Sequence, residues 1–446
     1  MNLLRNLFRS KRETSIFFFA LAVQSIILYL TMKTASGGFL WTSDAELYFD
    51  LGRNLLETGG FYMHPDLDPQ TIRTPLYPLF VAGLYGLTHS LFFVIAIQNI
   101  IAAYVLVIIY RIGATLVSER VALIGTVLFM LEARRLTNAS QLMSETLFML
   151  FFALSIYWLI IYLKTKQDRK LIIGSAIAAG LAIMTRPFLI PVIPLFVLLI
   201  LFVFWKKKFA IKHAALYVIL VIAVIMPWSA RNYYHFKTIN PISTAGANAY
   251  LTAAPRFLEY YEPGEERYAG LVTQAVGDLN YTGLPHLTPE ESFVRFGIFE
   301  FQYQDYLTTH AREIISQDYL LFGRVIAQKM GVFFIESSAS RSYSILFHQL
   351  NPPQQIFYPF LYFGGRIWWA IMFLLMAFGF WKYLATHKDK ASRGIIATII
   401  IMMLFFAFIS SMNKDTPRLR IPITPFITLF AAYGATIAMK YKLCKD

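Results

Sequence analysis

Long apolar runs alternate along this chain with short polar segments that contain clusters of basic residues. The first apolar run, 15–32, follows four basic side chains among the first twelve residues. It is long enough to cross a bilayer as a helix, and no small-residue cleavage motif follows it. We therefore expect a retained membrane anchor with a cytoplasmic N-terminus, which places residues 34–74 outside.

The short apolar run 75–89 decides the topology of the rest. Pro, Gly and His interrupt it. If it crossed the membrane, every later basic cluster would lie outside. If it stays outside as an interfacial or re-entrant helix, most of these clusters lie in the cytoplasm, as the positive-inside rule requires. The later spans are then 91–110, 121–131, 142–163, 171–185, 188–205, 214–226, 357–383, 394–410 and 421–439. We predict an all-α polytopic membrane protein of about ten spans with both termini inside.

The middle of the chain differs in composition from its two ends. Residues 231–355 are polar and rich in tyrosine, with proline, glycine and acidic turns. Within them, 322–335 is apolar but interrupted by charges, as in an amphipathic interfacial helix, with an extra span as the alternative. We therefore divide the chain into an N-terminal transmembrane module (1–230, with the first external loop at 34–75), a mixed external segment and the C-terminal transmembrane helices (356–446).

Composition supports a membrane protein and excludes a water-soluble one. Hydrophobic residues make up 57% of the chain, charged residues only 15%, and the mean hydropathy is +0.53. The net charge of +14 comes from clusters between apolar runs, so it reflects membrane topology rather than nucleic-acid binding. The single cysteine, Cys444, excludes an internal disulfide and a cysteine-based metal cluster.

The first external loop concentrates acidic residues in a chain that is otherwise basic. Ser43 and Glu46 form an S-x-x-E capping box, which predicts a helix over 44–58 that two glycines then end. Leucines at four-residue spacing line one face, as in a helix lying on a membrane. Asp44 lies in the first turn, where the helix dipole favours an ionised carboxylate. Such a group can act as a general base or bind a metal ion; a capped surface helix with solvated acids is the alternative.

The predicted topology also places several basic residues on the external side, against the positive-inside preference. Arginine binds phosphate through paired hydrogen bonds, and the phosphate of a lipid carrier lies at this depth. Alternatively, each arginine extends from a helix end toward headgroups, and Arg186 beside Pro187 could cap a helix. The charged residues placed there are Asp44, Arg73, Arg134, Arg135, Glu145, Arg186, Arg231, Lys414, Arg418 and Arg420.

Four sequence motifs follow one another on one predicted face of the membrane. They are Thr42-Ser-Asp-Ala45 with Arg73-Thr-Pro-Leu-Tyr-Pro78, Ser144-Glu-Thr-Leu-Phe148, Pro227-Trp-Ser-Ala-Arg-Asn-Tyr233, and Arg418-Leu-Arg-Ile-Pro422. Together they resemble the GT-C glycosyltransferases that use polyprenyl-phosphate sugars, and more specifically the branch that includes protein O-mannosyltransferases and the enzymes that add aminoarabinose to lipid A. Relatives often carry paired acids in the first loop, whereas Ala45 follows Asp44 here, and the resemblance does not extend to residues 250–350.

This resemblance implies a GT-C-like bundle that moves a sugar, with inversion, from an undecaprenyl- or dolichyl-phosphate carrier to an external acceptor. It implies Asp44 as catalytic base or metal ligand, with Glu145 aiding acceptor or metal binding. Tyr48, on the same helical face as Asp44, would line the pocket or pack as an interfacial aromatic. The residues implied for the carrier phosphate are Arg73, Arg231, Arg418, Arg420 and, with less support, Lys414.

The resemblance leaves the cofactor, the sugar and the acceptor open. A divalent metal ion is a candidate cofactor although no spacing signature identifies its site, and no other cofactor is expected. The protein would be a hexosyl- or pentosyltransferase acting on a protein, lipid or glycan, and its other partners would be membrane lipids. Bacterial relatives suggest the inner membrane, with the site on the periplasmic face.

Two other functional classes are compatible with basic residues and about ten spans. A transporter or flippase of lipid-linked glycans would show internal repeats and charges deep within its spans. A protein that only binds the lipid carrier would share the arginines but would not need Asp44.

Overall fold

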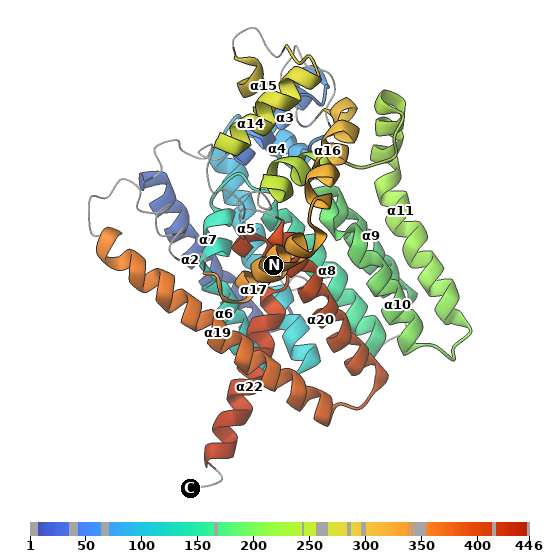
Figure 1. The fold of residues 1–446 in the computed structure, drawn as a ribbon. Helices are drawn as coiled ribbons and strands as arrows, with labels where there is room; N and C mark the ends of the chain where they lie inside the picture. The colour runs from blue at the N-terminus through green and yellow to red at the C-terminus, as the bar shows by residue number, and fades with distance from the viewer. Residues whose placement is uncertain are drawn as a thin grey trace.

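Helices account for all the regular structure in the described part of the chain. The computed structural model describes residues 8–34, 43–63, 71–164, 168–242, 245–255, 266–282, 287–295, 300–337, 339, 342, 354–412 and 416–443. Long helices form a bundle, and a group of shorter helices covers one end of it (Figure 1). The predicted all-α fold is confirmed.

Each predicted span coincides with a helix of the bundle. Among the described residues, six helices are long and apolar enough to cross a membrane: α2 (Lys11–Thr34), α5 (Leu91–Leu116), α8 (Glu145–Lys164), α11 (Phe209–Phe236), α19 (Gln354–Thr386) and α20 (Lys390–Ser411). Shorter apolar helices share their core: α6 (Glu119–Met130), α9 (Arg169–Thr185), α10 (Ile193–Val203) and α22 (Thr424–Leu443).

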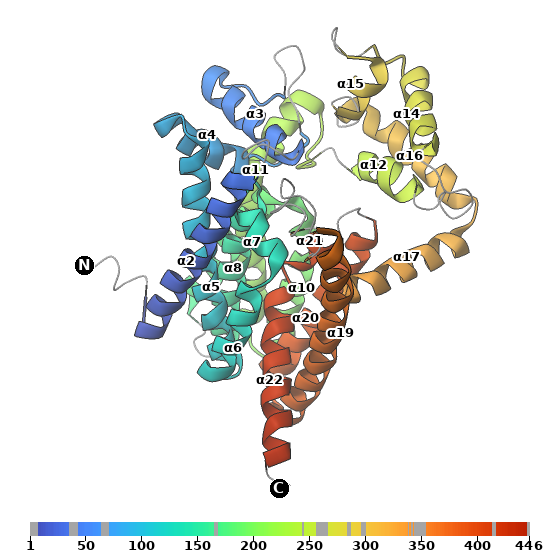
Figure 2. The same ribbon diagram turned by 90° about the vertical axis from the view of Figure 1, so that its left-hand side faces the viewer.

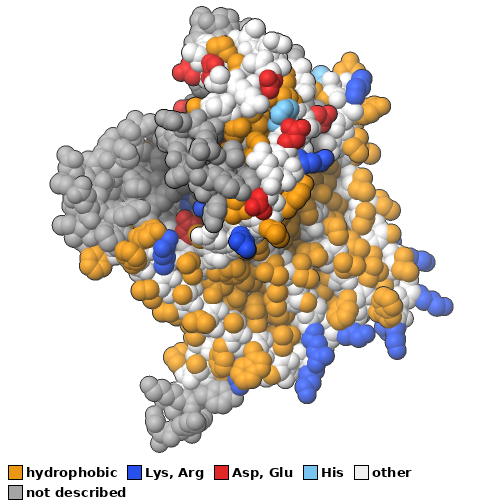
Figure 3. Space-filling model, in the orientation of Figure 1, with side chains coloured by type: hydrophobic (Ala, Val, Ile, Leu, Met, Phe, Trp, Pro, Cys, Tyr) orange, Lys and Arg blue, Asp and Glu red, His pale blue; other side chains and the backbone are white. Residues whose placement is uncertain are grey.

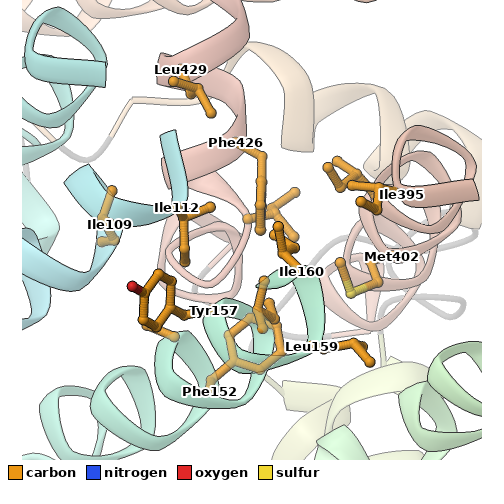
Figure 4. Packing of buried hydrophobic residues seen from close by; sticks show 14 of the residues in the cluster. Ile109, Ile112, Phe152, Tyr157, Leu159, Ile160, Ile395, Met402, Phe426 and Leu429 are labelled. Carbon is orange, nitrogen blue, oxygen red and sulfur yellow. The ribbon is translucent and has the colours of Figure 1, made fainter. Parts of the chain in front are cut away.

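A single large apolar core holds the bundle together. Figure 4 shows Phe152 and Ile160 of α8 close to Phe426 of α22 and Met402 of α20. Phe152 is 1% exposed and Met402 is 2% exposed. Burial of these side chains fixes α8, whose N-terminus carries Glu145, against the C-terminal helices.

The outside of the bundle is also apolar. Figure 3 shows hydrophobic side chains spread over its flank, with Lys and Arg gathered at the end away from the shorter helices. Leu198 and Leu374, for example, are 60% and 72% exposed. An apolar surface of this extent is typical of contact with lipid rather than water. The exposed cluster 206–208 lies at the basic end, between α10 and α11.

The segment predicted to form the first external loop contains two short helices. Helix α3 (Ser43–Thr58) has Asp44 in its first turn and ends at Gly59, whose φ is 73°. Helix α4 (Leu76–Thr88) contains 13 residues, which is too few to span a bilayer. The two helices pack beside each other at the end of the bundle that faces away from the C-terminus (Figure 2).

Helix α11 is longer than the sequence predicts. The pattern predicts an end near Pro227, but the helix continues through this residue to Phe236. The segment that follows folds back onto it, because Trp228 Nε1 donates to the carbonyl of Pro241 and Asn232 Nδ2 donates to that of Asn240, at 2.8 and 2.7 Å. The boundary predicted at residue 231 therefore falls inside a helix.

The shorter helices form a second, smaller core. Its centre contains Tyr250, Phe293 and Leu307, and each of these is fully buried. Its elements are α12 (Ala245–Asn248), the π-helix η3 (Ala249–Ala253), α14 (Glu266–Asp278), α15 (Pro289–Arg295) and α16 (Gln304–Ser316). We call these the external helices, after the side of the membrane predicted for them from the sequence. Helix α17 (Tyr319–Ile335) follows them and packs against α19 and α20.

Candidate functional site

A pocket of about 350 Å³ lies at the end of the bundle that carries α3. We call it the central pocket. Segments far apart in the chain line it: α3, the loop before α4, the 3-10 helix η2 (Pro187–Val192), α12, and α21 (Thr416–Arg420). Its charged lining residues are Asp44, Arg73, Arg186 and Arg418.

Asp44 is held between two arginines in this pocket. Arg73 Nη2 donates to Asp44 Oδ1 at 2.6 Å, and Arg418 Nη1 donates to Asp44 Oδ2 at 2.7 Å. The Asp44 side chain is nevertheless 26% exposed. Each carboxylate oxygen therefore has a cationic partner, while the group as a whole still faces the cavity.

Glu145 extends this arrangement into one continuous ion-pair network. Arg418 also donates through Nε to Glu145 Oε1, and Arg186 Nη1 lies 2.6 Å from the same oxygen. Three guanidinium groups thus face two carboxylates, which gives the network a net positive charge. A pocket with this charge and these N–H donors favours an anionic ligand such as a phosphate.

Helix ends and buried hydrogen bonds hold the network in place. Asp44 and Glu145 each lie in the first turn of a helix, where the dipole stabilises a carboxylate. Tyr48 bonds through its hydroxyl to Ser144 Oγ at 2.9 Å, which ties α3 to the N-terminus of α8. The Arg73 guanidinium lies over the Tyr48 ring, 5.5 Å from its centre. Tyr48, which is part of α3, thus links the helix that carries Asp44 to the start of the helix that carries Glu145.

The charges of the network also decide the ionisation of its members. Burial by itself raises the pKa of the Asp44 carboxyl, but the charges of Arg73 and Arg418 outweigh it and hold that pKa well below its usual range. Burial by itself lowers the pKa of Arg418, whereas Glu145 and Asp44 raise it well above its usual value. Asp44 is therefore ionised at neutral pH in the ligand-free protein.

A second pocket of about 650 Å³ adjoins the first. Thr74 and Thr185 line the central pocket, and their chain neighbours Pro75 and Met184 line the second one. We call it the apolar groove, since its other lining residues are mainly Leu55, Phe61, Leu79, Pro227 and Trp228, with Tyr62, His235 and the cation Arg231. A charged pocket and an apolar groove are thus separated by a wall of a few residues.

The structure places the residues predicted from the sequence at different positions. Five of them are brought together at the central pocket: Asp44, Glu145, Arg73, Arg418 and Tyr48.

Arg231 lies instead in the apolar groove, where its guanidinium stacks 4.7 Å from the centre of the Trp228 ring. Lys414 lies outside the described residues. Arg186, which the sequence places among the external arginines with a helix cap as the alternative, is a full member of the network.

Arg420 does not face the central pocket, contrary to its predicted role at the carrier phosphate. It is 1% exposed, and its two terminal nitrogens donate to the carbonyls of Phe333 and Glu336 at 2.6 and 2.7 Å. Its guanidinium also lies 3.6 Å from the centre of the Trp369 ring. Arg420 therefore caps the C-terminus of α17 and attaches it to α19.

We expect Arg420→Met to destabilise the protein by about 3 kcal/mol without removing a group that touches substrate, because two buried carbonyls lose their charged donor. Thermal unfolding in detergent should show a lower midpoint, while kcat per folded molecule stays near the wild-type value. Arg393→Met, at an exposed position on α20, is the matched control. A normal melting temperature with a lost kcat would instead place Arg420 in the reaction.

The described residues contain no group of three or more His, Cys, Asp or Glu side chains close enough to share a metal ion. Both oxygens of Asp44 accept hydrogen bonds from arginine. The cations that the described part of the central pocket offers to an anionic ligand are therefore the arginines.

Comparison with known proteins gives this arrangement a context. A family model described as dolichyl-phosphate-mannose-protein mannosyltransferase matches residues 71–230, which include Arg73, Glu145 and Arg186. The matched residues make up about a third of the chain. Asp44 and Arg418 lie outside the matched part and reach the same pocket through the fold.

Two solved structures of ArnT from Cupriavidus metallidurans are similar to this chain at 13% sequence identity. The structure bound to undecaprenyl phosphate has a TM-score of 0.42, and the apo structure has a TM-score of 0.40. In both comparisons the similarity covers 94% of this chain and 77% of the ArnT chain. No curated protein sequence matches the chain.

Proposed function

We propose that this protein is a glycosyltransferase of the GT-C type, which transfers a sugar, with inversion, from a polyprenyl-phosphate carrier to an acceptor on the external side of a membrane. The observation that carries this proposal is the ion-pair network, with its net positive charge, directly beside an apolar groove. The matching family model, whose description names a dolichyl-phosphate mannose, supports a donor of this class.

The arginines of the central pocket suit the leaving group of this reaction. When the bond between the anomeric carbon and the phosphate oxygen breaks, its electron pair leaves with the lipid phosphate. Arg73, Arg186 and Arg418 present N–H donors where this negative charge would develop. In the ligand-free protein these donors are engaged by Asp44 and Glu145, so an entering phosphate would share them with the carboxylates.

Asp44 is the residue that we propose as the general base. The acceptor oxygen or nitrogen forms a bond to the anomeric carbon and must lose a proton, which a nearby carboxylate can accept. Asp44 is ionised, partly exposed and faces the central pocket. A single displacement on the face opposite the phosphate inverts the anomeric configuration. Glu145 is 7% exposed on its side chain, so its role would be to position Arg186 and Arg418.

The apolar groove suits the lipid part of the donor. Its lining is mainly hydrophobic, as an isoprenoid chain requires, and Arg231 supplies positive charge at its border. The exposed basic cluster 206–208 lies at the opposite end of the bundle, and the positive-inside rule places such clusters in the cytoplasm. The central pocket would then face outward, which in a bacterium is the periplasmic side of the inner membrane.

The pH dependence of the reaction should reveal the coupling between Asp44 and the phosphate. Before the donor binds, the arginines hold the pKa of Asp44 low, so this carboxyl stays ionised in acidic solution. We therefore expect kcat/KM to keep its neutral-pH value down to below about pH 4, the usual pKa of an aspartate. A bound phosphate draws on the same donors and raises the Asp44 pKa, so kcat should fall at a higher pH than kcat/KM. Initial rates at saturating and low donor concentration test this, and coincident acidic limbs would contradict it.

A direct test uses the full chain in liposomes that contain a polyprenyl phosphate carrying a radiolabelled sugar. Candidate acceptors come from cell-envelope glycans that change, by mass analysis, when the protein is absent. We expect the label to move to the acceptor and free polyprenyl phosphate to form. Movement of the intact lipid across the bilayer without bond cleavage would show a flippase and overturn the proposal.

A further inference from the structure

The neutral polar groups of the central pocket differ in their availability to a ligand. The Tyr48 hydroxyl bonds to Ser144, and the Thr185 hydroxyl donates to the carbonyl of Leu181 at 2.9 Å. Thr74 is 2% exposed, and its hydroxyl is enclosed by protein. The charged groups bind one another. Most polar side chains that line the central pocket are thus bonded to other protein groups or enclosed by them, so they are not available to a ligand.

Asn248 differs from these residues. It is exposed, lines the central pocket, and its side chain makes no capping bond at the helix end where it lies. No other hydrogen bond of this side chain is present in the described part of the chain. A carboxamide offers two N–H donors and one acceptor oxygen, which matches a sugar hydroxyl that both donates and accepts.

The external helices hold this carboxamide at a defined place. The backbone N–H of Ala247, next to Asn248, donates to Gln304 Oε1 of α16 at 3.2 Å, and Gln304 is 8% exposed. Tyr250 is fully buried, and its hydroxyl donates to the carbonyl of Leu271 at 3.0 Å. Figure 2 shows α12 beside α16. Asn248 is therefore presented by a packed structure and not by a free loop.

We infer that Asn248 recognises a hydroxyl group of the donor sugar, and that Gln304 is the residue that positions it. The inference rests on the proposed function, because the sugar attached to the carrier phosphate would enter the central pocket that Asn248 also lines. The external helices then contribute to sugar selectivity through the neutral side chain of Asn248. The charged groups of the pocket have other roles, because the arginines bind the phosphate and Asp44 accepts the proton.

The test compares donors that differ at single hydroxyl groups while the acceptor is held constant. Suitable probes are polyprenyl-phosphate mannose, its C2 epimer glucose, its C4 epimer talose, and the corresponding monodeoxy sugars. With the preferred donor, Asn248→Ala should lower kcat/KM about tenfold. One deoxy donor should lower the wild-type value by a similar factor, and Asn248→Ala should cause no further loss with that donor.

Variants at other positions separate recognition from general damage. Gln274→Ala removes an exposed amide from α14, away from the pocket, and should leave all donors unaffected. Gln304→Leu removes the acceptor for the Ala247 N–H and should weaken discrimination between donors. Gln304→Glu keeps an acceptor oxygen there and should retain discrimination.

Two results would overturn the inference while leaving the proposed function in place. One is transfer by Asn248→Ala at the wild-type rate with every donor. The other is an effect of Asn248→Ala that changes with the acceptor and not with the donor sugar. If the wild-type protein transferred no sugar from any of these donors, the proposed function itself would fail.

Discussion

Replacing Asp44 with Asn should reduce sugar transfer from a polyprenyl-phosphate donor by about a thousandfold. The amide has nearly the same shape, but it cannot accept the proton of the acceptor group. It also leaves Arg73 and Arg418 without the charge that balances them. The measurement is the rate of label transfer in liposomes at saturating donor, with the amount of folded protein determined for each variant.

Asp50→Asn is the matched control because it changes the same charge on the same helix. Asp50 pairs with Arg53 at 3.5 Å, its side chain is 34% exposed, and it does not line the central pocket. This variant should transfer sugar at close to the wild-type rate. If Asp44→Asn retained wild-type transfer while the donor was still consumed, the catalytic assignment of Asp44 would be wrong.

Replacing Arg418 with Lys should lower transfer by about a hundredfold, although the positive charge is kept. One planar guanidinium reaches Asp44 through Nη1 and Glu145 through Nε. An ammonium group is a point charge and cannot span both carboxylates in this geometry. We expect a fall in kcat that exceeds the change in KM, because the arginine donors are needed most when charge develops on the leaving phosphate.

Arg393→Lys makes the same exchange at an exposed position on α20 and should have no effect on the rate. Thermal unfolding of both variants separates lost catalysis from lost folding. A normal kcat for Arg418→Lys together with a lower melting temperature would show that Arg418 only stabilises the fold.

Much of the fold follows from the sequence alone because lipid imposes a simple rule on it. A segment inside a bilayer must satisfy its own backbone hydrogen bonds, so each long apolar run becomes a helix. The capping box at Ser43 and the glycine at position 59 likewise set the limits of α3 by local chemistry. Pro227 misled the prediction because contacts from the returning segment, through Trp228 and Asn232, support a longer helix.

The site shows the same division between local and distant information. The predicted topology was enough to place Asp44, Glu145 and the external arginines on one side of the membrane, because the distribution of basic residues among the loops indicates which side each loop lies on. It could not show which of them touch, because Arg418 and Asp44 are 374 positions apart.

Arg418 and Arg420 illustrate the limit most clearly. They are two residues apart in a short helix, so at 3.6 residues per turn their side chains leave it in nearly opposite directions. One joins the ion-pair network and the other caps α17. The sequence by itself determined the helices, their order and the face that gathers charge, because these depend on local apolar length and pattern. Only the tertiary structure decided which charges are partners, because that depends on how distant helices pack.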